Sequence, residues 1–120
     1  MILISYPMTE AVLVKQEVDP EKVPKLKGWL EEVSNRTDEA VETLQDEGVA
    51  TESVFLEEST DGMFLVTYME AKDLQKAQEA FAESTHEIDV EHKQVLQECL
   101  VDDQAVDSFQ PVYHIANPDR

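Results

Sequence analysis

The chain has 120 residues, with 27 Asp and Glu against 9 Lys and Arg, which gives a formal net charge of −18. This length suits one domain with a single hydrophobic core and excludes two domains of ordinary size. The charge excludes a nucleic-acid-binding protein, because phosphates would be repelled and the few cations are scattered rather than gathered in a basic stripe.

The first half of the chain predicts a strand followed by a long helix. Residues 1–7 precede a second plausible start at Met8 and are expected to be a loosely held extension. Residues 10–18 are rich in β-branched side chains and predict a strand that ends before Pro20. A helix is predicted from about Pro20 to Glu47, where Gly48 stops it. Its apolar stripe recurs at steps of three and four: Leu26, Leu30, Val33, Thr37, Val41 and Leu44.

The second half predicts a hairpin, two helices and a last strand. Residues 49–58 and 63–70 read as strands joined by a turn at Asp61-Gly62. A second helix is predicted over residues 71–84, and a third is expected to begin with Asp89 as its N-cap. Ser84 and Glu87 have the spacing of a capping box. A last strand is predicted over residues 106–115, followed by a coil tail at 117–120.

The order of elements, β-α-β-β-α-(α)-β, predicts an α+β fold with a ferredoxin-like, four-stranded antiparallel sheet in one domain, residues 8–116. The predicted strands carry apolar side chains on both faces, for example Val54 and Leu56 opposite Phe55. Helices cover only one face of such a sheet, so we expect a homodimer packed through the other face. That architecture resembles the dimeric α/β barrel superfamily, which includes cofactor-free monooxygenases, isomerases and haem enzymes.

Several short motifs carry a closer resemblance, which covers roughly residues 10–120. They are Gly48, Val54 to Glu57, Ser84 to His86, Ile88-Asp89, Glu91-His92, Tyr113-His114 and Asn117 to Arg120. These motifs are similar to an uncharacterised family common in haloarchaea. The resemblance implies a halophilic source and implies no activity for any residue.

The acidic composition is typical of a surface adapted to a salt-rich cytoplasm, where screening relieves the self-repulsion of the charges. An acidic face that recognises a basic partner is the alternative. Cys99 is the only cysteine, so an intrachain disulfide is excluded, and its place on an apolar helical face predicts an inert core residue. Trp29 is expected to be a packing anchor. Because no apolar run has the length of a signal peptide or a membrane span, we expect a cytoplasmic protein that does not bind membranes.

Residues 84–92 concentrate the ionisable side chains, with His86 and His92 six residues apart among three acids. Together with His114 and a carboxylate, these histidines form a conceivable site for zinc, iron or manganese. The alternative is structural, with Asp89 as a cap and His92 as a packed core histidine. No cofactor is expected, because the three isolated glycines build no dinucleotide- or phosphate-binding loop.

The second functional interpretation is acid-base chemistry in the cleft between helices and sheet. His86 is the candidate base, because an imidazole titrates near neutral pH. Its candidate partners are Glu52, Tyr68 and His114, provided that they face one cavity. Glu52 is in phase with apolar neighbours, so it is either buried or at the rim of the sheet with its carboxylate in water.

These observations lead to two main expected functions, with a His and carboxylate metal-binding protein as a further alternative. The first is a small protein that binds a small molecule in the helix-sheet cleft, with cofactor-free monooxygenase-like or isomerase-like chemistry. The second is a dimeric structural or interaction protein without catalysis, whose histidines only cap and pack.

Overall fold

The computed structural model describes residues 8–102 and 104–120. The predicted N-terminal extension, residues 1–7, lies outside this range. No helix in the described ranges is long and apolar enough to cross a membrane.

Three long antiparallel strands form the sheet: β1 (Glu10–Val18), β2 (Val49–Ser59) and β3 (Gly62–Ala71). β3 lies between the other two, and its register with β1 runs from Ala71 opposite Glu10 to Met63 opposite Val18. The predicted hairpin is confirmed, with Ser59 opposite Gly62 and Gly62 at φ 130°, a backbone region that favours glycine. The α+β class and these three strands agree with the sequence prediction.

The predicted fourth strand over residues 106–115 is wrong in extent. Within residues 106–115, the paired strand is β4 (Asp107–Ser108), which lies opposite Lys15 and Val14 of β1. The sheet order is therefore β2-β3-β1-β4, with a two-residue strand at the β4 edge. Val112, Tyr113 and Ile115 are all strongly exposed, so these apolar side chains do not pack against the sheet. Pro111 also lacks the N–H that a ladder requires. The four-stranded ferredoxin-like sheet is thus reduced to three long strands and a short edge.

The predicted long helix from Pro20 to Glu47 is divided. A 3₁₀ turn (Pro20–Lys22) leads into α1 (Val23–Asn35), and α2 (Thr37–Glu47) follows a break at Arg36, whose φ and ψ are −115° and 41°. Hydroxyl side chains bond to the backbone at this point, since Ser34 Oγ donates to the carbonyl of Leu30 and Thr37 Oγ1 to that of Ser34. Such local bonds compete with a continuous helix. α2 ends at Gly48 in the left-handed region, as predicted.

The last two helices are α3 (Leu74–Glu83) and α4 (Glu87–Cys99). The expected N-cap role of Asp89 is wrong, because the helix begins at Glu87 with His86 as its N-cap. Asp89 therefore lies inside the first turn. The expected capping box is also not formed, because the Ser84 hydroxyl accepts a bond from the His86 backbone N–H.

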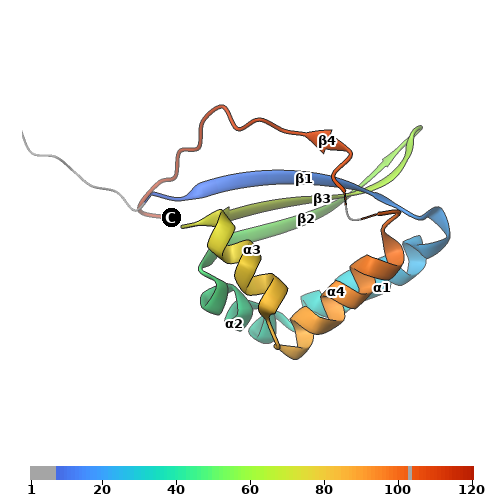
Figure 1. The fold of residues 1–120 in the computed structure, drawn as a ribbon, viewed down its shortest axis with the longest axis horizontal. Coiled ribbons are helices and arrows are strands. Elements are labelled where there is room, and N and C mark those ends of the chain that lie inside the picture. The colour runs from blue at the N-terminus through green and yellow to red at the C-terminus, as the bar shows by residue number, and fades with distance from the viewer. Residues whose placement is uncertain (1–7, 103) are drawn as a thin grey trace, which may run out of the picture.

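Figure 1 shows the layers of the molecule, with the four α-helices on one side of the sheet and the C-terminal segment on the other. α1 and α4 lie side by side, and α2 and α3 lie near the opposite end of the sheet. The two faces of the sheet thus have different cover, helices on one side and an extended chain on the other.

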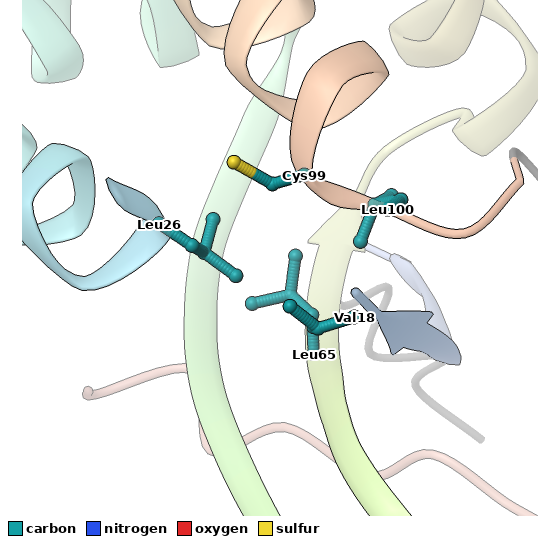
Figure 2. Close-up of a cluster of buried hydrophobic side chains, with 5 residues drawn as sticks. All are labelled: Val18, Leu26, Leu65, Cys99 and Leu100. Carbon is teal, nitrogen blue, oxygen red and sulfur yellow. The ribbon is translucent and has the colours of Figure 1, made fainter. Parts of the chain in front are cut away.

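The main core lies where α1 and α4 meet the sheet, as Figure 2 shows. Its buried members are Val18, Leu26, Leu65, Cys99 and Leu100. Burial raises the pKa of the Cys99 thiol, in agreement with its predicted place in the core. A second, smaller core of Val49, Ala71 and Ala77 joins α3 to the strands. The space between the two cores is only partly filled by side chains.

Candidate functional site

A cleft of about 610 Å³ lies between the helices and the sheet. Each long strand contributes alternate residues to it, because successive side chains of a strand point to opposite faces. Most of its wall is apolar. The apolar lining residues are Val12, Val14, Leu30, Val33, Ala40, Leu44, Val54, Leu65, Met69, Phe81, Ile88 and Leu96.

The ionisable part of the wall consists of three carboxyl groups and one imidazole. These belong to Glu47 at the end of α2, Glu52 on β2, and Asp89 and His92 on α4. Pockets that bind small molecules commonly have this composition, with a few polar groups in a mostly apolar surface.

Glu47 and Asp89 form the central pair. Asp89 is only 6% exposed. Its Oδ2 atom and the Oε1 atom of Glu47 are buried and accept no hydrogen bond from any residue that the structure describes. Burial first, and then a side-chain hydrogen bond to Asp89, raise the pKa of Glu47 to about 8. Near neutral pH the two adjacent carboxyl groups share one proton, while Oε1 of Glu47 and Oδ2 of Asp89 still have no donor among the described residues.

The helix termini decide which member of the pair holds the proton. Glu47 is the last residue of α2, where the partial negative charge of the helix end disfavours a carboxylate. Asp89 lies in the first turn of α4, where the helix end carries partial positive charge and favours one. We therefore assign the proton of the pair to Glu47.

Glu52 stands on the same wall, with an exposed side chain that borders the cleft. Burial raises its pKa, and the charge of Asp89 adds to that effect. Its exposed side chain agrees with the expectation of a place at the rim of the sheet.

His92 completes the polar wall and is held by Trp29. The indole Nε1 of Trp29 donates to His92 Nδ1 over 2.8 Å, so the neutral imidazole carries its proton on Nε2. Burial lowers the pKa of His92, although the charge of Asp89 opposes this. The predicted packing role of Trp29 is confirmed, since it is 8% exposed. His92 enters the site as a neutral hydrogen-bond donor.

A model of a family of unknown function, DUF6176, matches residues 9–120. The chain belongs to DUF6176. No curated protein and no solved structure matches it. The expected resemblance to an uncharacterised family is confirmed to this extent, and the description of the family assigns no activity to the cleft.

His86, the predicted base of this DUF6176 chain, lies outside the main cleft. It lines a smaller hollow of about 290 Å³ with Ser84, Thr85 and Glu83, and its Nε2 lies 2.6 Å from Asp46 Oδ2. That carboxylate is largely exposed, so the pair is a solvated contact between the C-terminal part of α2 and the turn before α4.

Tyr68 and His114 lie on the other face of the sheet. Tyr68 alternates with the cleft-lining residues Thr67 and Met69 of β3. His114 Nε2 lies 3.1 Å from Glu70 Oε2, in a network around that buried carboxylate. Of the four predicted site residues, the structure therefore brings only Glu52 into the cleft.

The network around Glu70 anchors the C-terminal segment of the DUF6176 fold. Glu70 is 1% exposed and accepts hydrogen bonds from Arg120 and Thr9 as well as contacting His114. Arg120 first, and then the other two partners, lower the pKa of Glu70 to about 2. This carboxylate is fully engaged and serves as an anchor on the outer face.

The three histidines proposed as metal ligands have separate partners: Asp46 for His86, Trp29 for His92 and Glu70 for His114. Among the described residues, no group of three or more His, Cys, Asp or Glu side chains has a geometry that could hold a metal ion. The sequence-based metal site is thus not assembled in this conformation.

Glu47 is the candidate site residue that sequence reasoning missed. The sequence pattern places it at the polar end of one long helix, whereas the break at Arg36 sets a new phase for α2. In that phase Ala40, Thr43, Leu44 and Glu47 share the cleft face. The spacing of Asp89 and His92 at i and i+3 on one helix is a readable signal of a shared face, although it is equally typical of capping and packing.

Proposed function

We propose that this DUF6176 protein binds a small, mostly apolar molecule in the cleft between its helices and its sheet and exchanges a proton with it. The observation that carries the proposal is the Glu47–Asp89 pair on a mostly apolar wall, because one buried oxygen of each side chain has no donor among the described residues. The cleft volume of about 610 Å³ is in the range of small-molecule sites.

Glu47, Asp89 and His92 each have a distinct part in this chemistry. Protonated Glu47 donates a proton to a bound molecule and becomes a carboxylate, and the neighbouring Asp89 favours the return of the proton to Glu47. The carboxylate form of Glu47 performs the reverse step. A group with a pKa near the working pH is effective in both directions. His92 donates a hydrogen bond from Nε2 to an oxygen or nitrogen of the ligand.

This arrangement supports isomerase-like chemistry more than oxygenation. Removal of a proton from one atom and its return to another needs a donor, an acceptor and an apolar surface that orients the molecule. Glu47, Glu52 and the apolar wall supply these three requirements. The proposed cleft chemistry thus keeps the cofactor-free class expected from the sequence and moves its centre from His86 to Glu47.

A fragment screen tests the binding claim directly. The single tryptophan, Trp29, reports on the cleft through its bond to His92, and amide chemical shifts map each hit. Val14→Phe places a larger side chain in the cleft, whereas the adjacent Leu13→Phe changes the opposite face of β1 and is the matched control. We expect hits that shift cleft residues and bind at least tenfold more weakly to Val14→Phe.

Hits that map to other surfaces, or that bind Val14→Phe and Leu13→Phe equally, would contradict the proposal. Hits that carry an acidic C–H then allow a test of proton exchange by deuterium uptake from D₂O. Glu47→Gln should slow this exchange by roughly 10²- to 10⁴-fold. Glu42→Gln, a change at an exposed residue of the same helix, should leave it unaltered.

A second candidate role, a homodimer formed through the outer face of the sheet, is favoured by the exposed apolar side chains there. Val112, Tyr113 and Ile115 are 90%, 79% and 82% exposed, and Phe55 on the outer face of β2 is 59% exposed. Large apolar side chains that are exposed together are candidates for an interaction site. A second copy of the chain supplies the same surface and makes a self-complementary contact, as in the dimeric α/β barrel that the sequence predicts.

Light scattering in concentrated KCl measures the oligomeric state. A dimer that dissociates in the double variant Tyr113→Ser/Ile115→Ser supports this role, while Val41→Ser, a change at an exposed apolar residue on α2, should leave the dimer intact. A monomeric wild type would remove the dimer from the proposal and leave the cleft chemistry in place.

A further inference from the structure

We infer that the molecule bound in the cleft carries a positively charged amino group beside an apolar body, and that this amino group lies against Glu47 and Asp89. The inference rests on the proposed function, because it names the class of molecule that the cleft takes.

The first support is the unmet hydrogen-bonding capacity of the pair. Asp89 is more than nine-tenths buried, and its Oδ2 and the Oε1 of Glu47 receive no donor from the described protein. A buried carboxylate without a donor is costly. An alkylammonium group brings up to three N–H donors and one positive charge, so it can serve both oxygens at once. A hydroxyl offers one donor, and a carboxylate offers none.

The second support is the charge of the surrounding wall. Glu47 faces Asp89 and His92 from α4, Glu52 from β2, and Asp46 from its own helix. His86 is engaged with Asp46 in the neighbouring hollow. The residues that line the cleft include no Lys or Arg. A cleft with charges of one sign and low-dielectric walls concentrates ions of the opposite sign.

The third support is the apolar surface next to the pair. Ile88, Leu44 and Phe81 line the same cleft and come from three helices around it. A free metal ion or ammonium ion would leave this surface uncovered. A ring or a branched alkyl chain attached to the amino group covers it and gains free energy in proportion to the apolar area buried.

Binding of such a cation releases a proton. The ammonium N–H groups replace the proton that Glu47 shares with Asp89, and that proton passes from the Glu47 carboxyl to the buffer. No covalent bond of the ligand forms or breaks in this step. Glu47 is then a carboxylate beside the ligand, which is the form required of a base in the proposed function.

Isothermal titration with benzylamine, which is protonated at neutral pH, tests the inference. The titrations are run in about 1 M KCl to screen the acidic surface, and in buffers of different ionisation enthalpy. We expect release of close to one proton at pH 7 and an affinity that rises about tenfold between pH 6.5 and 8, because Glu47 loses its own proton over that range. Benzyl alcohol and benzoate, which have the same ring, should bind at least tenfold more weakly.

Three variants locate the binding. Asp89→Asn and Glu47→Gln should each lower the benzylamine affinity at least tenfold and abolish the proton release, while the control Glu42→Gln should preserve both. Val14→Phe should reduce the binding of all three probes, and this result distinguishes binding in the cleft from binding to the acidic surface. The Trp29 emission spectrum confirms that each variant is folded.

Equal or tighter binding of benzyl alcohol or benzoate would overturn the inference, and so would benzylamine binding that is unchanged in Asp89→Asn and Glu47→Gln. In either case, weaker binding of benzyl alcohol, the neutral probe, to Val14→Phe would leave the proposed function in place. Benzylamine binding that survives Val14→Phe unchanged would place the cation on the acidic surface and also overturn the inference.

Discussion

Replacement of Glu47 by glutamine should change the pH dependence of folding stability, because the folded protein holds a proton on Glu47 that the unfolded chain releases. Its pKa is 4.5 in the unfolded chain and about 8 in the folded protein. Between these values the folded state binds more protons, so the contribution of Glu47 is fully present below about pH 4.5 and is lost as the pH rises through 8.

The magnitude follows from the width of this pH window. One full proton is worth about 1.4 kcal/mol per pH unit. A window of about 3.5 pH units therefore gives an upper bound of about 5 kcal/mol. Glu47 is only partly buried, and solvent screening reduces the expected change to about 2 kcal/mol. The amide introduced by Glu47→Gln cannot titrate, so the variant does not lose this stability as the pH rises. Its free energy of unfolding therefore increases relative to that of the wild type.

Guanidinium unfolding followed by Trp29 fluorescence, repeated between about pH 5 and 9, measures the difference between the two proteins. The difference in the free energy of unfolding should change by about 2 kcal/mol in favour of the Glu47→Gln variant as the pH rises. Glu42→Gln should keep the wild-type profile. A difference that stays flat over this range would refute the shared proton on Glu47.

Three further predictions concern the rest of the fold. Leu26→Ala should lower the free energy of unfolding by about 2 to 5 kcal/mol, because Leu26 is 0% exposed in the main core. The exposed control Val41→Ala should change it by less than about 0.5 kcal/mol, and similar values for both variants would contradict the described core. The low pKa of Glu70 adds stability that is present above about pH 4.5 and is lost as the pH falls toward 2. The Tm of Arg120→Ala should therefore fall less than that of the wild type over this range. An equal fall in both proteins would argue against Glu70 as the anchor. We also propose that the protein is halophilic, so its Tm should rise as KCl is added at neutral pH and screens the net charge of −18. A Tm that does not depend on the KCl concentration would contradict this proposal.

The sequence predicted the elements that are specified by local signals. The β-branched run of residues 10–18, the Asp61-Gly62 turn and the helix stop at Gly48 all appear where they were expected. These features depend on backbone preferences of a few neighbouring residues, and such preferences can be read without knowledge of the tertiary structure.

Two predictions are wrong at places where contacts from distant parts of the chain act together with local bonds or in place of them. The break at Arg36 interrupts a pattern that remains periodic on both sides of it, and the Arg36 side chain is held there by Glu39 on α2 and Glu91 on α4. The segment after Ser108 has apolar residues typical of a strand, but it leaves the edge of β1, and the distant Glu70 anchors its end.

The candidate site was located only coarsely from the sequence. The helix-sheet cleft and Glu52 were expected, while His86, Tyr68 and His114 lie elsewhere. Sequence spacing identifies residues that share one helix face. It does not reveal that the end of α2 meets the start of α4, which is the contact that brings Glu47 to its partner carboxyl.

The most direct test of the central claim is the titration of the Glu47 carboxyl carbon by ¹³C NMR in the wild type and in Asp89→Asn. We predict a wild-type midpoint near pH 8 that falls clearly in the variant, where the neighbouring negative charge is gone. A wild-type midpoint near 4.5, or one that Asp89→Asn leaves unchanged, would contradict a shared proton and the acid-base role proposed for the cleft.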